Sequence, residues 1–296
     1  MALWIPVTIL AAFVQNLRFL FQKRLTEAGL GPAAATLARF LYSSPVVLAV
    51  ALALAPGVLV RAPAAFWGWA ILGGTAQILA TVCVMRLFGL RNFAIGMMLK
   101  RTEVLMAVLW GWVLLGDAVS GLALAAILTG VLGVLIISAP PEGRRGIDPA
   151  TLALGLAAGL LFGISGNGYR GASLALEATG AGLSALVTLA AVTTMQTIAL
   201  CAWLASRDRP QLVRTLQAWR VGGLVGLTSM IGSYCWFLAF SLQAVGYVNA
   251  LGQVEVLFSI FTARLVFGEA ISRREYAGLA LLTASILALV LVTGTG

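Results

Sequence analysis

Apolar residues in this chain form ten long runs that are separated by short polar segments. Each run holds about 20 residues, the length that an α-helix needs to cross the hydrocarbon core of a bilayer. No polar segment is long enough to form a soluble domain. The pattern therefore predicts ten transmembrane helices. The runs cover residues 3–24, 33–55, 66–86, 93–115, 119–138, 150–171, 181–205, 219–242, 246–267 and 274–293.

The two halves of the chain repeat each other at a constant shift of 152 residues. Glu103 and Glu255 stand at matching positions, each in the middle of an apolar run. Other pairs keep the same shift without gaps: Trp67 and Trp219, Cys83 and Cys235, Phe88 and Phe240, and Ser120 and Ser272. The sequence therefore predicts a duplicated unit, with a first repeat in 1–138, a cytoplasmic linker in 139–149 and a second repeat in 150–296.

An odd number of helices in each repeat has a geometric consequence. With five helices per repeat, the second copy enters the membrane from the opposite face. The two repeats are then related by a pseudo-two-fold axis in the membrane plane, which is typical of many transporters. The predicted fold class is an all-α integral membrane protein with ten transmembrane helices in two inverted five-helix repeats.

Composition agrees with the membrane class and excludes others. The chain of 296 residues is 61% hydrophobic and only 10% charged, whereas a soluble domain has about 25% charged residues. The formal net charge of +9 does not indicate nucleic acid, because the basic residues stand at the ends of apolar runs instead of forming a patch. We therefore expect the chain to lie in a lipid bilayer and to bind no nucleic acid.

The sequence carries no sign of a cofactor or of enzyme chemistry. The three cysteines lack metal-ligand spacing, and the chain has no histidine. It contains no G-x-x-x-x-G-K-[ST], G-x-S-x-G or H-E-x-x-H motif. We therefore expect no cofactor, no resident metal and no enzyme activity.

The distribution of lysine and arginine predicts the orientation. One side of the predicted membrane collects only Arg61 and Arg170, and the positive-inside rule places the other, richer side in the cytoplasm. Both termini then face away from the cytoplasm. The richer side holds Lys23, Arg24, Arg86, Arg91, Arg144, Arg145, Arg207, Arg209, Arg214, Arg220, Arg273 and Arg274.

Ionisable residues inside the apolar runs are the strongest candidates for function. A charge in hydrocarbon costs at least about 2.5 kcal/mol, so a retained one is a functional-site candidate. Lys100 and Glu103 are three residues apart and share one helix face. Gln253 and Glu255 occupy the corresponding stretch of the second repeat. These four residues are predicted to line a central pathway. The alternative, that they are static ion pairs between helices, remains open.

Five further polar residues extend this candidate site. They are Asn16, Gln77, Asn167, Tyr234 and Asn249, all within predicted helices. For any single serine or tyrosine in the predicted helices, an interhelical hydrogen bond is the favoured role. As a set the polar residues indicate a wet cavity that can bind a polar solute. Asn167 also continues a stripe of glycines with a four-residue spacing, a pattern that brings helix backbones close together.

A repeated element closes the fourth helix of each half. It reads Gly116-Asp117-Ala118-Val119-Ser120 in the first half and Gly268-Glu269-Ala270-Ile271-Ser272 in the second. With these elements in two five-helix repeats, the chain resembles the drug/metabolite transporter superfamily, in its ten-helix EamA-type branch. The resemblance implies ten helices around a central cavity, alternating access and location in the bacterial inner membrane. The branch includes exporters of amino acids and related metabolites.

The leading hypothesis is a secondary transporter that exports amino acids or similar small zwitterionic metabolites across the inner membrane. Lys100 would receive a carboxylate, and Glu103 or Glu255 an ammonium group or a proton, so protons are a candidate coupling ion. Two alternatives stay open: an exporter of cationic drugs or other metabolites by proton antiport, and a membrane scaffold or lipid-handling protein. Because the inverted partner is fused in one chain, a monomer is expected.

Overall fold

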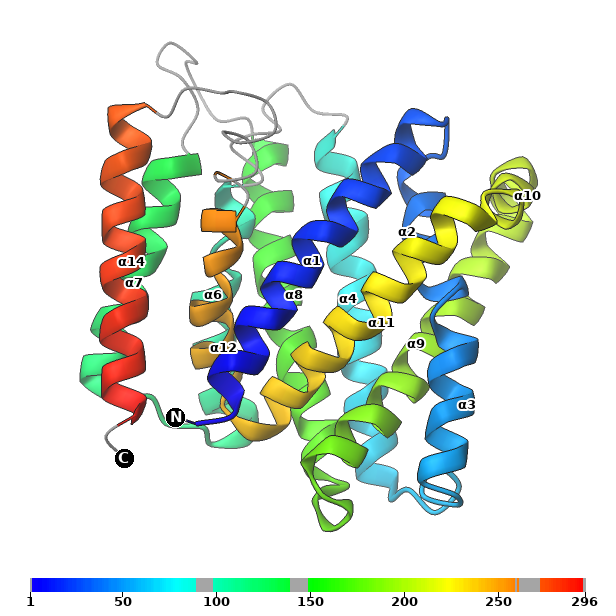
Figure 1. The fold of residues 1–296 in the computed structure, drawn as a ribbon, viewed down its shortest axis with the longest axis horizontal. Helices are drawn as coiled ribbons and strands as arrows, with labels where there is room; N and C mark the ends of the chain where they lie inside the picture. Colours follow the sequence, from blue (N-terminus) through cyan, green and yellow to red (C-terminus); the bar gives the residue numbers. More distant parts are fainter. Residues whose placement is uncertain (1, 89–97, 139–148, 259, 261–271, 295–296) are drawn as a thin grey trace. The chain divides into compact units, whose positions relative to one another are not determined.

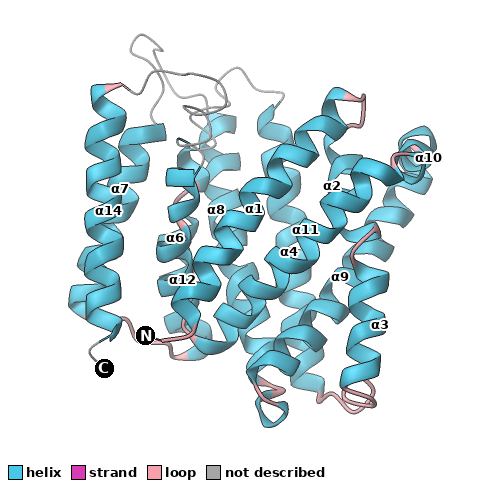
Figure 2. Ribbon diagram, viewed as in Figure 1, coloured by secondary structure: helices cyan, strands magenta, loops and turns pink. Residues whose placement is uncertain are grey.

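The protein consists of helices in the part of the chain that the computed structural model describes, residues 2–88, 98–138, 149–258, 260 and 272–294. No strand occurs among these residues (Figure 2). The elements, labelled in Figure 1, are α1 (Trp4–Glu27), α2 (Pro32–Leu41), α3 (Ser44–Leu54), α4 (Ala64–Phe88), α6 (Glu103–Trp110), the π-helix η1 (Gly111–Leu115), α7 (Gly121–Ser138), α8 (Pro149–Leu174), the 3₁₀-helix η2 (Glu177–Thr179), α9 (Ala181–Arg207), α10 (Arg209–Gln217), α11 (Trp219–Leu242), α12 (Val245–Gly252) and α14 (Arg273–Gly294).

Eight helical segments of the described residues are long and apolar enough to cross a membrane. They coincide with eight of the predicted runs, and α11 has the predicted bounds of 219–242. The predicted all-α integral membrane class is thereby confirmed. The predicted runs 93–115 and 246–267 lie partly outside the described residues, as do most of the predicted linker and the element Gly268-Glu269-Ala270-Ile271.

The second predicted run is found as one candidate membrane span, Pro32–Leu54, but it is divided into two helices. Helix α2 ends before Tyr42, and α3 starts at Ser44. At the interruption the N–H of Ser43 donates to the carbonyl oxygen of Phe40 at 3.1 Å, a tighter turn than in an α-helix. Pro45 in the first turn of α3 has no N–H to donate, which favours a break immediately before it.

Helix α10 was not predicted, because it lies in the polar segment between the predicted runs 181–205 and 219–242. The side chain of Asp208 caps the helix by accepting a hydrogen bond from the N–H of Gln211 at 3.3 Å. Oε1 of Gln211 also accepts a bond from the N–H of Gly31 at 3.0 Å. This second bond ties α10 to the turn between α1 and α2.

The helices are grouped in two compact units. The first unit comprises Met1–Ile9, Ala76–Asn167 and Gln243–Gly296, and the second comprises Leu10–Thr75 and Gly168–Leu242. Each unit takes helices from both predicted repeats. The repeat boundaries themselves stay a prediction.

In the first unit, α7 and α14 pack against each other in opposite directions. A Cβ on Gly133 would stand 2.8 Å from the carbonyl oxygen of Gly278, so the backbones touch there. Further along, the hydroxyl of Ser285 donates to the carbonyl oxygen of Ala126 at 2.6 Å. Small residues and an interhelical hydrogen bond thus hold this pair together, as is common in membranes.

In the same unit, helix α8 packs against α6 through Gly159 and Gly163 of the predicted glycine stripe. A Cβ on Gly163 would stand 2.8 Å from the backbone carbonyl carbon of Met106. One turn earlier, a Cβ on Gly159 would stand 3.2 Å from the backbone nitrogen of Glu103. The packing role predicted for this stripe is confirmed at both glycines.

The second unit comprises most of α1, the first half of α4, the end of α8, and all of α2, α3, η2, α9, α10 and α11. Its apolar core includes Leu25, Leu37 and Val225, which are all fully buried. The ring of Tyr42 lies against Gly222 of α11, and the Cβ and carbonyl group of Tyr42 lie against Gly226, where the absence of side chains leaves room for them. Tyr42 thereby fills the position at which α2 and α3 separate.

The packing of Gly163 leads to a testable difference between two helical glycines. A Gly163→Ala variant should unfold at a lower temperature, since its methyl group meets backbone atoms and such overpacking costs about 1–3 kcal/mol. Gly223 of α11 has no atom within 4 Å of its Cβ position, so Gly223→Ala should keep or raise the melting temperature. Thermal unfolding of both variants in detergent tests this, and equal melting temperatures would contradict the packing described.

Candidate functional site

The fourth predicted helix is interrupted next to its charged residues. Residues 98–100 are helical, Arg101 and Thr102 form a turn, and α6 starts at Glu103. In this turn the N–H of Thr102 donates to the carbonyl oxygen of Leu99 at 3.0 Å, the spacing of a 3₁₀-helix. Tight turns of this kind within a helix often mark functional positions.

The ninth predicted helix has the same irregularity at the matching place. Helix α12 ends at Gly252, Gln253 forms a turn, and helix resumes at Val254. The backbone angles of Gln253 are φ −61° and ψ −12°, and those of Thr102 are φ −61° and ψ −9°. In known transporters with inverted repeats, binding sites are formed by interrupted helices at corresponding positions of the repeats.

The two interruptions lie at a similar height in the first unit. Figure 1 shows α6 and α12 running in opposite directions, and Val108 of α6 packs on Gly246 of α12. With a rise of 1.5 Å per residue, Glu103 lies about 8 Å from this contact along the axis, and Gln253 lies about 11 Å from it in the same direction. The turns of both helices therefore fall in one layer.

Lys100 and Glu103 form an ion pair in this layer. Nζ of Lys100 lies 2.7 Å from Oε2 of Glu103, and each side chain is only 19% exposed. Nζ also lies 4.6 Å from the ring centroid of Phe162 on α8, a cation–π contact. The two charges thus neutralise each other within contact distance of an aromatic ring.

Gln253 is buried and turned toward α7. Its side-chain oxygen lies 3.2 Å from the Cβ position of Gly130, and the residue is 4% exposed. Its Nε2 has no hydrogen-bond partner among the described residues. Gln253 therefore has a buried hydrogen-bond donor, Nε2, and its side chain lies next to α7.

The other predicted site residues divide between the two units. Gln77, Asn249 and Glu255 are half-buried residues of the first unit. Asn167 belongs to the same unit and is fully buried, and its Nδ2 donates to the carbonyl oxygen of Ala107 at 3.0 Å. It contacts α6 but not the ion pair.

Asn16 and Tyr234 belong to the second unit. Asn16 is buried, and the hydroxyl of Tyr234 donates to the carbonyl oxygen of Gly182 at 3.4 Å. Neighbouring polar groups of this unit are also paired, as in the bond from Nη2 of Arg39 to the hydroxyl of Ser233 at 3.1 Å. These bonds of Tyr234 and Ser233 agree with the interhelical role predicted for a single serine or tyrosine.

Sequence reasoning did not find Phe162 or Thr102. Phe162 is an ordinary apolar residue by pattern, but it lies three residues after Gly159 and thus on the α8 face that was predicted to pack. Thr102 stands between two charged residues, and its hydroxyl donates to the carbonyl oxygen of Leu99 at 2.8 Å. A hydroxyl that bonds back to the chain in this way offers an alternative to helical bonding.

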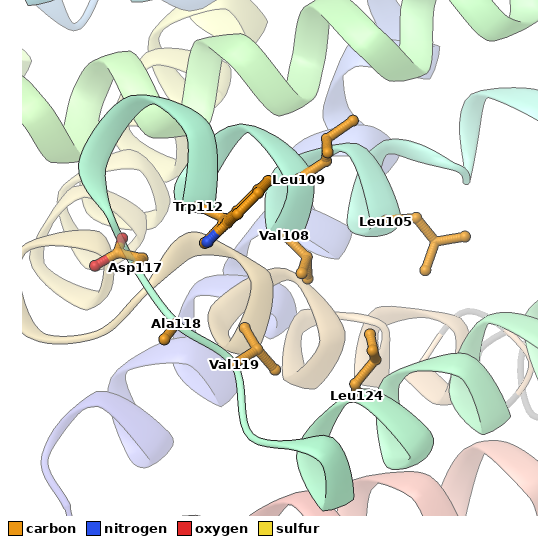
Figure 3. Close-up of a pocket in the computed structure, with 8 residues that line it drawn as sticks. All are labelled: Leu105, Val108, Leu109, Trp112, Asp117, Ala118, Val119 and Leu124. Atoms are coloured by element: carbon orange, nitrogen blue, oxygen red, sulfur yellow. The ribbon is translucent and has the colours of Figure 1, made fainter.

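An open pocket of about 430 Å³ lies on the first unit, further along the fourth helix. Figure 3 shows that Asp117 stands at one end of it and Leu105 at the other. Apart from Asp117 its lining is apolar: Leu105, Val108, Leu109, Trp112, Ala118, Val119 and Leu124. Among the described residues no group of three or more His, Cys, Asp or Glu side chains could hold a metal ion.

The Lys100–Glu103 pair makes a prediction about stability. Lys100→Met or Glu103→Gln alone leaves a half-buried charge without its partner and should lower the melting temperature, by about 1–3 kcal/mol of unfolding free energy. The double variant removes both charges and should recover most of this loss. The exposed pair Lys23–Glu27, 4.0 Å apart, is the control, because its removal should cost less than about 1 kcal/mol. A loss in the double variant equal to the sum of the two single losses would show that the pair is not coupled.

Comparison with known proteins agrees with the fold. The family model described as the EamA-like transporter family matches residues 150–291. A solved crystal structure superposes with a TM-score of 0.72 over 98% of this chain and 96% of that chain, at 17% sequence identity, a likeness in fold alone. A search of curated proteins gave no significant match. Residues 150–291 thus form an EamA-like transporter family domain.

Proposed function

We propose that this transporter exports amino acids or similar small zwitterionic metabolites across the inner membrane by alternating access. The observation that carries the proposal is the Lys100–Glu103 pair, which joins both signs of charge at 2.7 Å beside an interrupted helix. A zwitterion carries the same two charges and can replace each partner in the pair. Lys100 receives its carboxylate, and Glu103 receives its ammonium group.

Partial exposure supports this role for the pair. Each side chain keeps 19% of its surface accessible, whereas a purely structural ion pair in hydrocarbon gains from complete burial among other protein groups. Phe162 adds an apolar and aromatic surface next to the ammonium of Lys100. Binding sites for small molecules combine such apolar walls with a few charged groups that fix orientation.

The location of the basic residues supports the predicted orientation with both termini outside the cytoplasm. In the first unit, Nε of Arg274 donates to the carbonyl oxygen of Ile136 at 2.8 Å, so the start of α14 lies beside the end of α7. In the second unit, the turn after Lys23 and Arg24 contacts α10 through Gln211. Basic helix ends thus gather at one side of each unit, as the positive-inside rule requires of a cytoplasmic face.

Measurements of transport distinguish a role of the Lys100–Glu103 pair in the transport pathway from a purely structural role. Purified protein in liposomes should take up a labelled zwitterionic amino acid saturably, with competition from other amino acids. Lys100→Met, Glu103→Gln and the double variant should each lower the uptake rate at least about tenfold, because each removes a charge-assisted contact worth about 1.5–3 kcal/mol. The double variant regains stability but not transport.

The same experiment distinguishes the alternatives. Wild-type uptake by the double variant would make the pair structural, whereas the Lys23→Met/Glu27→Gln control should transport normally. Uptake of a lipophilic cation in place of every amino acid would favour the export of cationic drugs. No uptake of any solute would favour a scaffold or lipid-handling protein.

The orientation has its own test. Alkaline phosphatase fused after the C-terminus should be active in cells, and green fluorescent protein at the same place should be dark, because the C-terminus is predicted to face away from the cytoplasm. The matched fusions after Arg207, between α9 and α10, should give the opposite result. Fluorescence of the C-terminal fusion would contradict the orientation.

A further inference from the structure

The open pocket beside the fourth helix is a groove that follows the helix from the middle of its span to its end. Its volume is about 430 Å³, and Figure 3 shows Leu105 at one end and Asp117 at the other. Leu105 lies near the middle of the predicted run 93–115, and Asp117 lies just beyond it. From Leu105 to Leu115, a rise of 1.5 Å per residue gives about 15 Å, half of the roughly 30 Å of a hydrocarbon core. The groove therefore extends over the depth of one leaflet.

The walls of this groove are apolar and uncovered. Every lining side chain except that of Asp117 is apolar. Leu109 is 45% exposed, Trp112 64% and Leu124 38%, so the rest of the described chain does not cover them. Trp112 stands three residues before the end of the run, at the level where tryptophan is enriched in membranes. In a bilayer, the surroundings of such walls are acyl chains.

The groove lies on the face of α6 that points away from the ion pair. A helix turns by about 100° per residue, which places Leu105, Val108 and Leu109 about 140–240° around the axis from Glu103. The side of α6 near Glu103 packs against α8, through Gly163 among others. A solute held by the ion pair therefore does not reach the groove, and the groove needs an occupant of its own.

We propose that this groove, which we name the α6–α7 groove, binds one acyl chain of a membrane phospholipid. Its course along the helix, its depth of one leaflet and its apolar walls match an extended chain whose headgroup lies at the membrane surface. Its volume is within the range of small-molecule sites, about 300–1,000 Å³. Because hydrocarbon surrounds the protein, the gain comes from packing contacts with both walls and not from the removal of water.

A second copy of the chain fits the α6–α7 groove less well than a lipid. A stable protein interface uses about 20–30 residues of each partner, whereas eight residues line the groove. A single acyl chain can contact Leu109 and Trp112 on one wall and Leu124 of α7 on the other. The bound lipid thereby fills the space between the fourth helix and α7 and stabilises their packing.

Lipid binding can be measured directly on the purified full chain in detergent. The probe is phosphatidylethanolamine with one palmitoyl and one oleoyl chain, followed by native mass spectrometry and by thermal unfolding. The wild type should retain one lipid, and its melting temperature should rise saturably, because a ligand of the folded state stabilises it. Leu124→Trp fills the groove from α7 and should weaken retention at least about tenfold, since the indole replaces several methylene groups of the chain. Leu109→Trp fills it from α6 and should give the same result, which covers the case that one variant does not fold.

A matched control makes the outcomes decisive. Leu132→Trp is the same change on α7 at a residue that is 52% exposed and does not line the groove, and it should keep the full lipid response. The inference is overturned if both filled variants retain lipid like the wild type, or if Leu132→Trp loses as much as Leu124→Trp. It is also overturned if the wild type has the mass of a dimer and Leu124→Trp that of a monomer, because the occupant is then a second copy. No solute is transported in this measurement, so its outcome is independent of the proposed function.

Discussion

An interrupted helix in a membrane must be covered by protein, because hydrocarbon cannot hydrogen-bond to backbone groups that a turn releases. This constraint governs the first unit. The turn at Arg101 and Thr102 lies against α8, where Gly159 lets the two backbones meet. The hydroxyl of Thr102 closes part of the turn from within by bonding to Leu99. The irregular backbone that carries the ion pair therefore depends on a residue without a side chain in another helix.

Successive turns of α8 meet successive features of the fourth helix. Gly159 meets the interruption, Gly163 meets the middle of α6, and Asn167 meets the start of the π-helix. One helix face thus supports the ion pair at one end and the start of the π-helix at the other. A shift of α8 along its axis would therefore change the surroundings of both.

Hydrophobic pattern predicted the helices well because run length and lipid exposure leave a strong signal, as the agreement for α11 illustrates. It did not predict the turns at Thr102 and Gln253, since a change in ψ of some 30° leaves the order of apolar residues unchanged. The break before Pro45 and the cap at Asp208 do have local signals, in proline and in Asp followed by Arg-Pro.

For the candidate site, spacing on one helix predicted the contact of Lys100 with Glu103, because residues three apart share a face. The direction of Gln253 toward α7 depends on which helices surround it, and a sequence does not contain that information. The burial of Asn167 was predictable from its place on the glycine stripe. Its bond to the carbonyl oxygen of Ala107 became visible only in the structure, because it depends on how α8 packs against α6.

The aromatic ring beside Lys100 has a kinetic consequence. If Glu103 were the only group near the ammonium, separating the pair would expose a bare charge to a poorly polar surrounding, and the barrier to opening would be high. The ring of Phe162, whose centroid lies 4.6 Å from Nζ, gives the ammonium group a second favourable contact, a cation–π interaction. Lys100 can then exchange one partner for another in small steps. Its ammonium group keeps a favourable contact throughout the exchange.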